Sequence, residues 1–152
     1  MKKGLIGSRH CQRHPLFCGY NNDIFNAITG WSSEFVAIRR DIHRYPELGF
    51  EEHRTSTLVA NRLSAWGYSV ERGLGGTGVV GQLKRGQSQR RLGLRADMDA
   101  LPITEANDFD HVSHHAGVMH ACGHDGHTAM LLAAARYLAE EGKFDGTLNL
   151  IF

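Results

Sequence analysis

Histidine and cysteine gather in one short stretch of the sequence, His120-Ala-Cys-Gly-His-Asp-Gly-His127. Thiolate and neutral imidazole are the side-chain groups that bind zinc-like cations best. In an extended loop, residues two apart point the same way, so Cys122 and His124 are predicted to share one metal ion. Gly123 and Gly126 let the backbone bend around that ion, and the helix predicted to follow favours a thiolate at Cys122.

Two further residues of this stretch are open to more than one interpretation. Asp125 is either the N-cap of the following helix or a carboxylate that supports a metal ligand by hydrogen bonding. His127 falls in the first helical turn, where it either supports the site or is simply exposed. The H-E-x-x-H pattern is absent and two ligands are too few for a closed structural zinc site, so a histidine-rich surface loop stays open as the alternative.

Two carboxylates, Asp97 and Asp99, follow a predicted apolar strand at 91–96. The ends of strands are where α/β sheets present their sites. Carboxylates at such a place ligate a metal, orient a ligand or take part in proton transfer. For either residue taken alone, an Asx-turn that closes the strand is the alternative interpretation.

The glycines at 73–78 fit the pattern G-x-G-x-x-G, and Asp97 lies about 20 residues further on, as a dinucleotide-binding fingerprint requires. That mechanism needs a helix directly after the glycines, because the helix N-terminus holds the pyrophosphate. The residues that follow, Val79-Val80-Gly81-Gln82-Leu83, are typical of a strand. The motif is therefore interpreted as a hairpin turn, with nucleotide binding as the rival.

The hydrophobic pattern along the chain predicts alternating helices and strands around these motifs. Residues 1–30 show no sustained periodicity and are interpreted as a poorly specified leader. Helices are predicted from Ser32, as the N-capping residue, to Tyr45, and over 52–66 and 126–141; strands are predicted over 68–71, 78–83, 91–96 and 147–152, and a long loop over 97–125. This order predicts a layered α/β domain in which strand 147–152 presents an unpaired apolar edge.

Composition excludes several classes of function. Lys+Arg 17 against Asp+Glu 16 gives a net charge of +1, which offers no electrostatic case for binding nucleic acid or an anionic membrane. Hydrophobic content of 41% and charged content of 22% are typical of an ordinary folded domain. With no apolar run near the ~20 residues of a membrane span and no signal-peptide core, the protein is predicted to be soluble and cytoplasmic. The cysteines, at 11, 18 and 122, are predicted to be reduced thiols.

Two long ordered motifs, Gly93–Ile103 and Met119–Met130, resemble those of the aminoacylase/hippurate hydrolase branch of the M20 metallopeptidases. The segment Arg39–Phe50 is similar to the opening helix and turn of that branch, and the resemblance extends over 32–152. It implies a layered α/β/α catalytic domain that carries a smaller inserted lid and dimerisation domain. Residues 31–152 are then the N-terminal part of the catalytic domain, truncated within a core strand and without the lid.

The resemblance also implies an activity. Members of this branch use two divalent ions and a metal-activated water to cleave N-acyl amino acids into a carboxylic acid and a free amino acid. By position, Cys122 and His124 match metal ligands, and Asp99 matches the catalytic-site carboxylate that supports the metal centre. More distant relatives have a histidine ligand where this chain has Asp97, so direct metal contact by Asp97 is not implied. Zn, Mn, Co and Ni all suit such a donor set.

The general base and the next ligand of the family are expected from a pair of glutamates after the strand that ends here, and further histidine ligands are expected later. The chain as given is therefore predicted to have little or no hydrolytic activity. The alternative is a non-catalytic relative that binds a metal or a partner through the exposed edge of strand 147–152. An N-acyl amino acid is the predicted substrate, and a homo-oligomer is left open.

Overall fold

The computed structural model describes residues 20–152, which form a mixed α/β structure with a sheet and helices packed against it. The elements in chain order are α2 (Tyr20–Gly30), α3 (Ser32–Arg44), α4 (His53–Ala65), β1 (Ser69–Leu74), β2 (Gly78–Arg85), β3 (Arg91–Arg95), α5 (His124–Glu140) and β4 (Gly146–Ile151). The predicted α/β class is confirmed. The predicted strands and the two later helices agree with these bounds to within three residues at each end.

The four strands form one sheet in the order β1-β2-β4-β3. Strands β1 and β2 form an antiparallel hairpin and β2 pairs antiparallel with β4, whereas β3 pairs parallel with β4. Helix α5 is the crossover that a parallel pair requires. Leu148 of β4 is thus opposite Leu83 on one side and Leu92 on the other. The predicted unpaired edge at 147–152 is wrong, because the crossover inserts β4 between two earlier strands.

The glycine-rich segment forms the turn of the β1–β2 hairpin. Gly73, Gly75 and Gly76 have φ of 85°, 64° and 107°, a region that residues with a side chain rarely adopt. Leu74 pairs with Gly78, and β2 begins at that residue. No helix follows the glycines, so the interpretation as a hairpin turn is confirmed and the structural requirement of the nucleotide fingerprint is not met.

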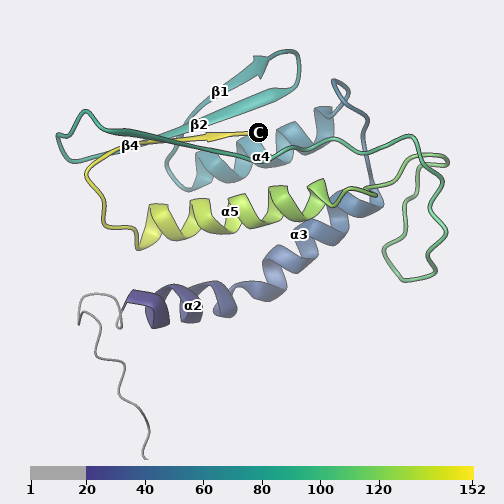
Figure 1. Ribbon diagram of the computed structural model, residues 1–152, viewed down its shortest axis with the longest axis horizontal. Helices are drawn as coiled ribbons and strands as arrows, with labels where there is room; N and C mark the ends of the chain where they lie inside the picture. The colour runs from purple at the N-terminus through teal and green to yellow at the C-terminus, as the bar shows by residue number, and fades with distance from the viewer. Residues whose placement is uncertain (1–19) are drawn as a thin grey trace, which may run out of the picture.

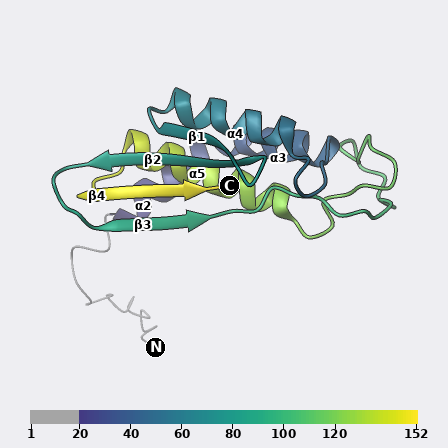
Figure 2. The ribbon, with the colours of Figure 1, turned by 90° about the horizontal axis from the view of Figure 1, so that it is seen from above.

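The helices α3, α4 and α5 lie under one face of the sheet, as Figures 1 and 2 show from two directions. The core fills the space between these two layers, and its fully buried side chains come from both: Ile42, Val59, Leu63, Val79, Leu132 and Leu150. Residues 20–152 place no helix on the other face of the sheet, so the second helical layer and the lid that the resemblance implies are not supplied by this part of the chain.

Two details of the N-terminal region differ from the sequence analysis. Residues 20–30, part of the expected leader, form helix α2, whereas residues 1–19, with Cys11 and Cys18, lie outside the described residues. Ser32 is the first residue of α3 and not its cap. Trp31 joins the two helices, since its N–H donates to Ala27 and its carbonyl accepts from Glu34. The backbone thereby satisfies the groups that a capping side chain would serve. None of the described helices is long and apolar enough to span a bilayer.

Candidate metal centre

The C-terminal end of β3 and the first turn of α5 meet at one end of the sheet. Asp97 and Asp99 follow β3, and His124 and His127 belong to the first turn of α5. The two segments are fastened together by the Thr128 hydroxyl, which donates to the backbone carbonyl of Asp97 at 3.0 Å. The fold therefore brings together four of the predicted site residues that are about 25 to 30 positions apart in the sequence.

Asp97, His124 and His127 form the candidate metal group of the described residues. Each offers one ligand atom, and the three atoms lie within 4.8 Å of one another. His127 Nδ1 is 2.7 Å from Asp97 Oδ1, and His124 Nε2 is 3.7 Å from the same oxygen. The hydrogen bond from His127 lowers the pKa of Asp97, so this carboxyl is ionised at neutral pH. Two imidazoles and a carboxylate are donors that suit Zn, Mn, Co or Ni.

Asp99 fixes the ring of His124. His124 Nδ1 lies 2.9 Å from Asp99 Oδ1 and 3.0 Å from the Asp99 backbone carbonyl, so both acceptors face the same ring nitrogen. A hydrogen on Nδ1 serves these oxygens and leaves the lone pair of Nε2 free, on the side where Asp97 lies. This is the arrangement by which a carboxylate orients a metal-binding histidine.

Cys122 is placed differently from the sequence prediction. Gly123 has φ of 85° and is the N-cap of α5, which begins at His124, two residues before the predicted start. Residues 122–124 are therefore not an extended segment, and the i, i+2 argument for a shared ion does not hold. The Cys122 thiol is exposed and is not part of the three-donor group. That Cys122 binds metal stays a prediction from the resemblance.

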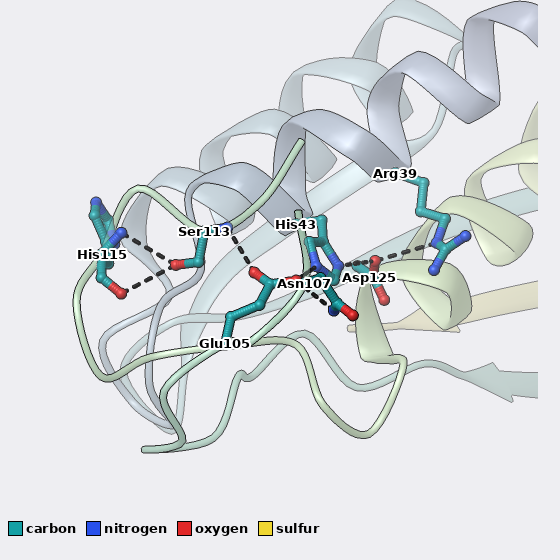
Figure 3. Close-up of polar contacts among 7 residues, drawn as sticks. All are labelled: Arg39, His43, Glu105, Asn107, Ser113, His115 and Asp125. Atoms are coloured by element: carbon teal, nitrogen blue, oxygen red, sulfur yellow. Dashed lines mark hydrogen bonds and ion pairs between the residues drawn. The ribbon is translucent and has the colours of Figure 1, made fainter. Parts of the chain in front are cut away.

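Asp125 is not part of the three-donor group, and its side chain bonds to α3 instead. Its side chain is fully buried, and Oδ2 accepts hydrogen bonds from Arg39 Nε at 3.1 Å and from His43 Nδ1 at 2.9 Å (Figure 3). It does not cap α5, because Gly123 occupies that position. Asp125 thus joins the helix that carries His124 and His127 to a neighbouring helix.

Three residues with buried side chains near the three-donor group, His43, Glu105 and His120, were not predicted from the sequence as site residues. His43 and Glu105 hydrogen-bond to each other at 3.0 Å, and their side chains are 6% and 5% exposed. His120 is also buried, and burial lowers its pKa to about 4, so the ring is neutral at pH 7. His43 could have been found from the sequence, because it is a polar residue on the apolar side of a predicted helix, next to Ile42. Nothing local to Glu105 marks it.

Lowering the pH is expected to reduce the stabilisation that Glu105 gives to the loop between β3 and α5. Burial raises the pKa of Glu105, but hydrogen bonds from Asn107, His43 and the Ser113 backbone outweigh it and lower the pKa from 4.5 to about 2. Because the folded pKa is below the unfolded one, the stabilisation is complete above pH 4.5 and is lost as pH falls toward 2.

We expect Glu105→Gln to lower the free energy of unfolding by about 1 to 2 kcal/mol at pH 7, since a charged acceptor is replaced by a neutral one. The difference from the wild type should shrink toward zero as the pH falls to 2. Urea unfolding at pH 7, 5 and 3 measures it. If the difference in unfolding free energy stayed constant over this pH range, these hydrogen bonds would not be what lowers the pKa of Glu105.

Comparison with known proteins identifies relatives of this chain. Residues 93–152 match the model of peptidase family M20/M25/M40. The chain is 56% identical over 119 residues to a hippurate hydrolase of Campylobacter jejuni, an alignment that covers 78% of this chain and 31% of the relative. It is 47% identical over 134 residues to thermostable carboxypeptidase 1 of Saccharolobus solfataricus, covering 86% of this chain and 33% of the relative.

A solved structure agrees with the sequence relatives. The YXEP protein of Bacillus subtilis, described as a dinuclear metal binding peptidase of the M20 family, superposes with a TM-score of 0.76 at 32% identity. The match covers 82% of this chain and 35% of that protein. The chain thus spans about a third of the length of the relatives it matches.

Proposed function

Because the chain belongs to peptidase family M20, we propose that the complete protein is a metal-dependent amidohydrolase that cleaves N-acyl amino acids to a carboxylic acid and a free amino acid. The observation that carries the proposal is the group of Asp97, His124 and His127 where β3 meets α5. Two relatives' names support the substrate class: hippurate is N-benzoylglycine, and a carboxypeptidase also hydrolyses the amide bond of a terminal amino acid.

In this proposal each site residue has a distinct part. His124 binds a divalent ion through Nε2, together with Cys122, and Asp99 holds the imidazole in that orientation through Nδ1. Asp97 and His127 lie beside His124 and offer a carboxylate oxygen and an imidazole nitrogen as further metal-binding atoms. What a divalent ion supplies here is polarisation of the amide carbonyl and a lower pKa for the attacking water. Residues 31–152 are proposed to be the N-terminal part of the catalytic domain.

A hollow next to the carboxylates supports an acylated amino acid as substrate. A cavity of about 320 Å³ is lined by Asp97 and Asp99 together with Phe50 and Leu74, which are apolar and exposed. Arg95, which is also exposed, adds a positive charge to the same rim. An apolar acyl group fits the first pair, and the carboxylate of an amino acid suits the arginine.

The 152-residue chain by itself is proposed to bind metal but to turn over little or no substrate. Among residues 20–152 there is one group of three donors, and the family resemblance expects the general base and the other ligands elsewhere. Calorimetric titration with Zn²⁺ or Mn²⁺ should show saturable binding, while glycine release from N-benzoylglycine should stay at background. Absence of binding would contradict the metal centre. Turnover that Cys122→Ala abolishes would contradict the inactivity of the chain and support the amidohydrolase.

The alternative of a non-catalytic binding module has lost its structural argument. It rested on an unpaired edge at strand 147–152, and that strand, β4, is paired on both sides. Nucleotide binding is likewise not supported, because the strand β2 follows the glycine motif where that mechanism requires a helix. The amidohydrolase is the function that the described residues support best.

A further inference from the structure

His43 is a buried histidine that bonds through both ring nitrogens to residues far away in the sequence. Its Nδ1 is 2.9 Å from Asp125 Oδ2, and its Nε2 is 3.0 Å from Glu105 Oε1. The side chains of His43, Asp125 and Glu105 are 6%, 0% and 5% exposed. Figure 3 shows the ring between the two carboxylates, with Arg39 on the far side of Asp125. The Arg39–Phe50 motif, which the proposed function does not use, thus has its histidine among these buried polar side chains.

The chemistry of these contacts makes them strong. Each ring nitrogen of His43 has a carboxyl oxygen within hydrogen-bond distance, so the imidazole is held from both sides. The Arg39 guanidinium donates through Nε to the same Asp125 Oδ2 at 3.1 Å. Arg39, Asp125, His43 and Glu105 thus form one continuous row of polar contacts, in which Arg39 is half exposed and the other three side chains are buried. Removing one partner from such a row leaves a buried polar group without its hydrogen bond, which costs more than the loss of an exposed bond.

The two bonds of His43 join three separate segments of the fold. His43 belongs to α3, Asp125 belongs to the first turn of α5, and Glu105 belongs to the loop between β3 and α5. Glu105 in turn accepts the backbone N–H of Ser113 at 2.6 Å, which fastens the far part of that loop. A single imidazole thus holds both the loop that follows Asp97 and the helix turn that carries His124 and His127.

Comparison with the other buried residues of α3 indicates that His43 does more than pack against the core. The other buried side chains of this helix, Phe35, Ile38 and Ile42, are apolar and belong to the core. A hydrophobic residue at position 43 would fill the same volume without the cost of burying polar groups. The polar bonds instead fix direction, because a hydrogen-bonded ring allows little rotation of Asp125 and hence of the helix turn on either side of it.

We propose that His43 is a positioning residue of the metal centre, acting through Asp125 and Glu105 to hold His124 and His127 where they bind an ion. This inference rests on the proposed function, in which His124 is a metal ligand. A supporting residue behind a metal ligand contributes roughly 10- to 100-fold in metal affinity. His43 bonds to no ligand and acts through Asp125, the chain neighbour of His124, so its expected contribution is at the lower end of that range, about tenfold.

The test compares three variants of the 152-residue chain. His43→Phe keeps an aromatic ring and removes both bonds, and His43→Gln keeps one donor group. Ile38→Val changes a buried side chain on the same face of α3 and is the matched control for packing. Two quantities are measured on each folded protein: the exchange rate of amide hydrogens over 119–127, relative to those of α4, and the dissociation constant for Zn²⁺.

In His43→Phe, exchange over 119–127 is expected to rise by about tenfold or more while α4 is unchanged, and Zn²⁺ affinity to fall by about tenfold. His43→Gln should give a smaller change in the same direction, and Ile38→Val none. Wild-type exchange over 119–127 in both His43 variants would overturn the inference, as would an equal rise in Ile38→Val. His43→Gln decides the matter if His43→Phe does not fold. Failure of the wild type to bind Zn²⁺ would count against the proposed function, and the exchange rates would still decide the role of His43.

Discussion

Replacing His124 with alanine is expected to remove saturable Zn²⁺ binding from the chain. Both the geometry and the resemblance support His124 as a ligand. Asp99 holds its Nδ1, its Nε2 faces Asp97, and the family resemblance places it among the metal ligands. Loss of a residue that only supports a ligand costs roughly 10- to 100-fold in affinity. Loss of the ligand itself should exceed that range, so calorimetric titration of His124→Ala should show no binding at concentrations that saturate the wild type.

Two other variants interpret that result. His53→Ala, an exposed histidine at the start of α4, is the control and should bind Zn²⁺ as the wild type does. Cys122→Ala tests the ligand that the geometry leaves outside the three-donor group. With Co²⁺ as the probe, a thiolate-to-metal absorption band that disappears in Cys122→Ala would show that the thiol binds. Wild-type affinity in His124→Ala would refute the proposed centre.

Much of the fold was predictable because it depends on local patterns. The glycines at 73–78 demand a turn with positive φ, and the β-branched residues after them favour a strand, so the hairpin followed from neighbouring residues alone. The place of β4 did not follow. It depends on the crossover by α5 and on pairing with β2 and β3, whose paired residues are 56 to 71 positions earlier in the chain. Nothing within 147–152 distinguishes a central strand from an edge strand.

Some residues of the candidate site were likewise predictable from local patterns, and others depend on contacts between distant parts of the chain. Asp97, Asp99, His124 and His127 were singled out by their place after a strand and before a helix, and the structure brings them together. His43 and Glu105 were missed because their importance comes from contacts over 62 to 82 positions. The start of α5 was misplaced by two residues because a left-handed glycine, Gly123, opens the helix in place of a capping side chain.

Gly146→Ala is expected to be among the most destabilising single-methyl changes in the described chain. Gly146 begins β4, is buried, and has φ of +147°, a conformation that residues with a side chain avoid. A Cβ at this position would lie 2.6 Å from the backbone carbonyl of Arg90, the group that accepts the N–H of Thr147. Relief of that contact requires the first residues of β3 and β4 to separate. Backbone strain and overpacking together should cost about 3 kcal/mol or more, and lower Tm by roughly 6 to 12 °C.

The matched control is Gly75→Ala in the exposed turn of the β1–β2 hairpin. Gly75 also has positive φ, at 64°, but an added Cβ there would meet no atom within 4 Å. Only the conformational strain of about 1 to 2 kcal/mol applies. Thermal unfolding of both variants compares an open left-handed turn position with one where the strain at φ +147° and the contact with the Arg90 carbonyl act together, so Gly146→Ala should lose clearly more stability. Equal loss of stability would mean that β3 and β4 accommodate the methyl group at no cost, and that their parallel pairing at this end is looser than the register of Arg91 with Thr147 implies.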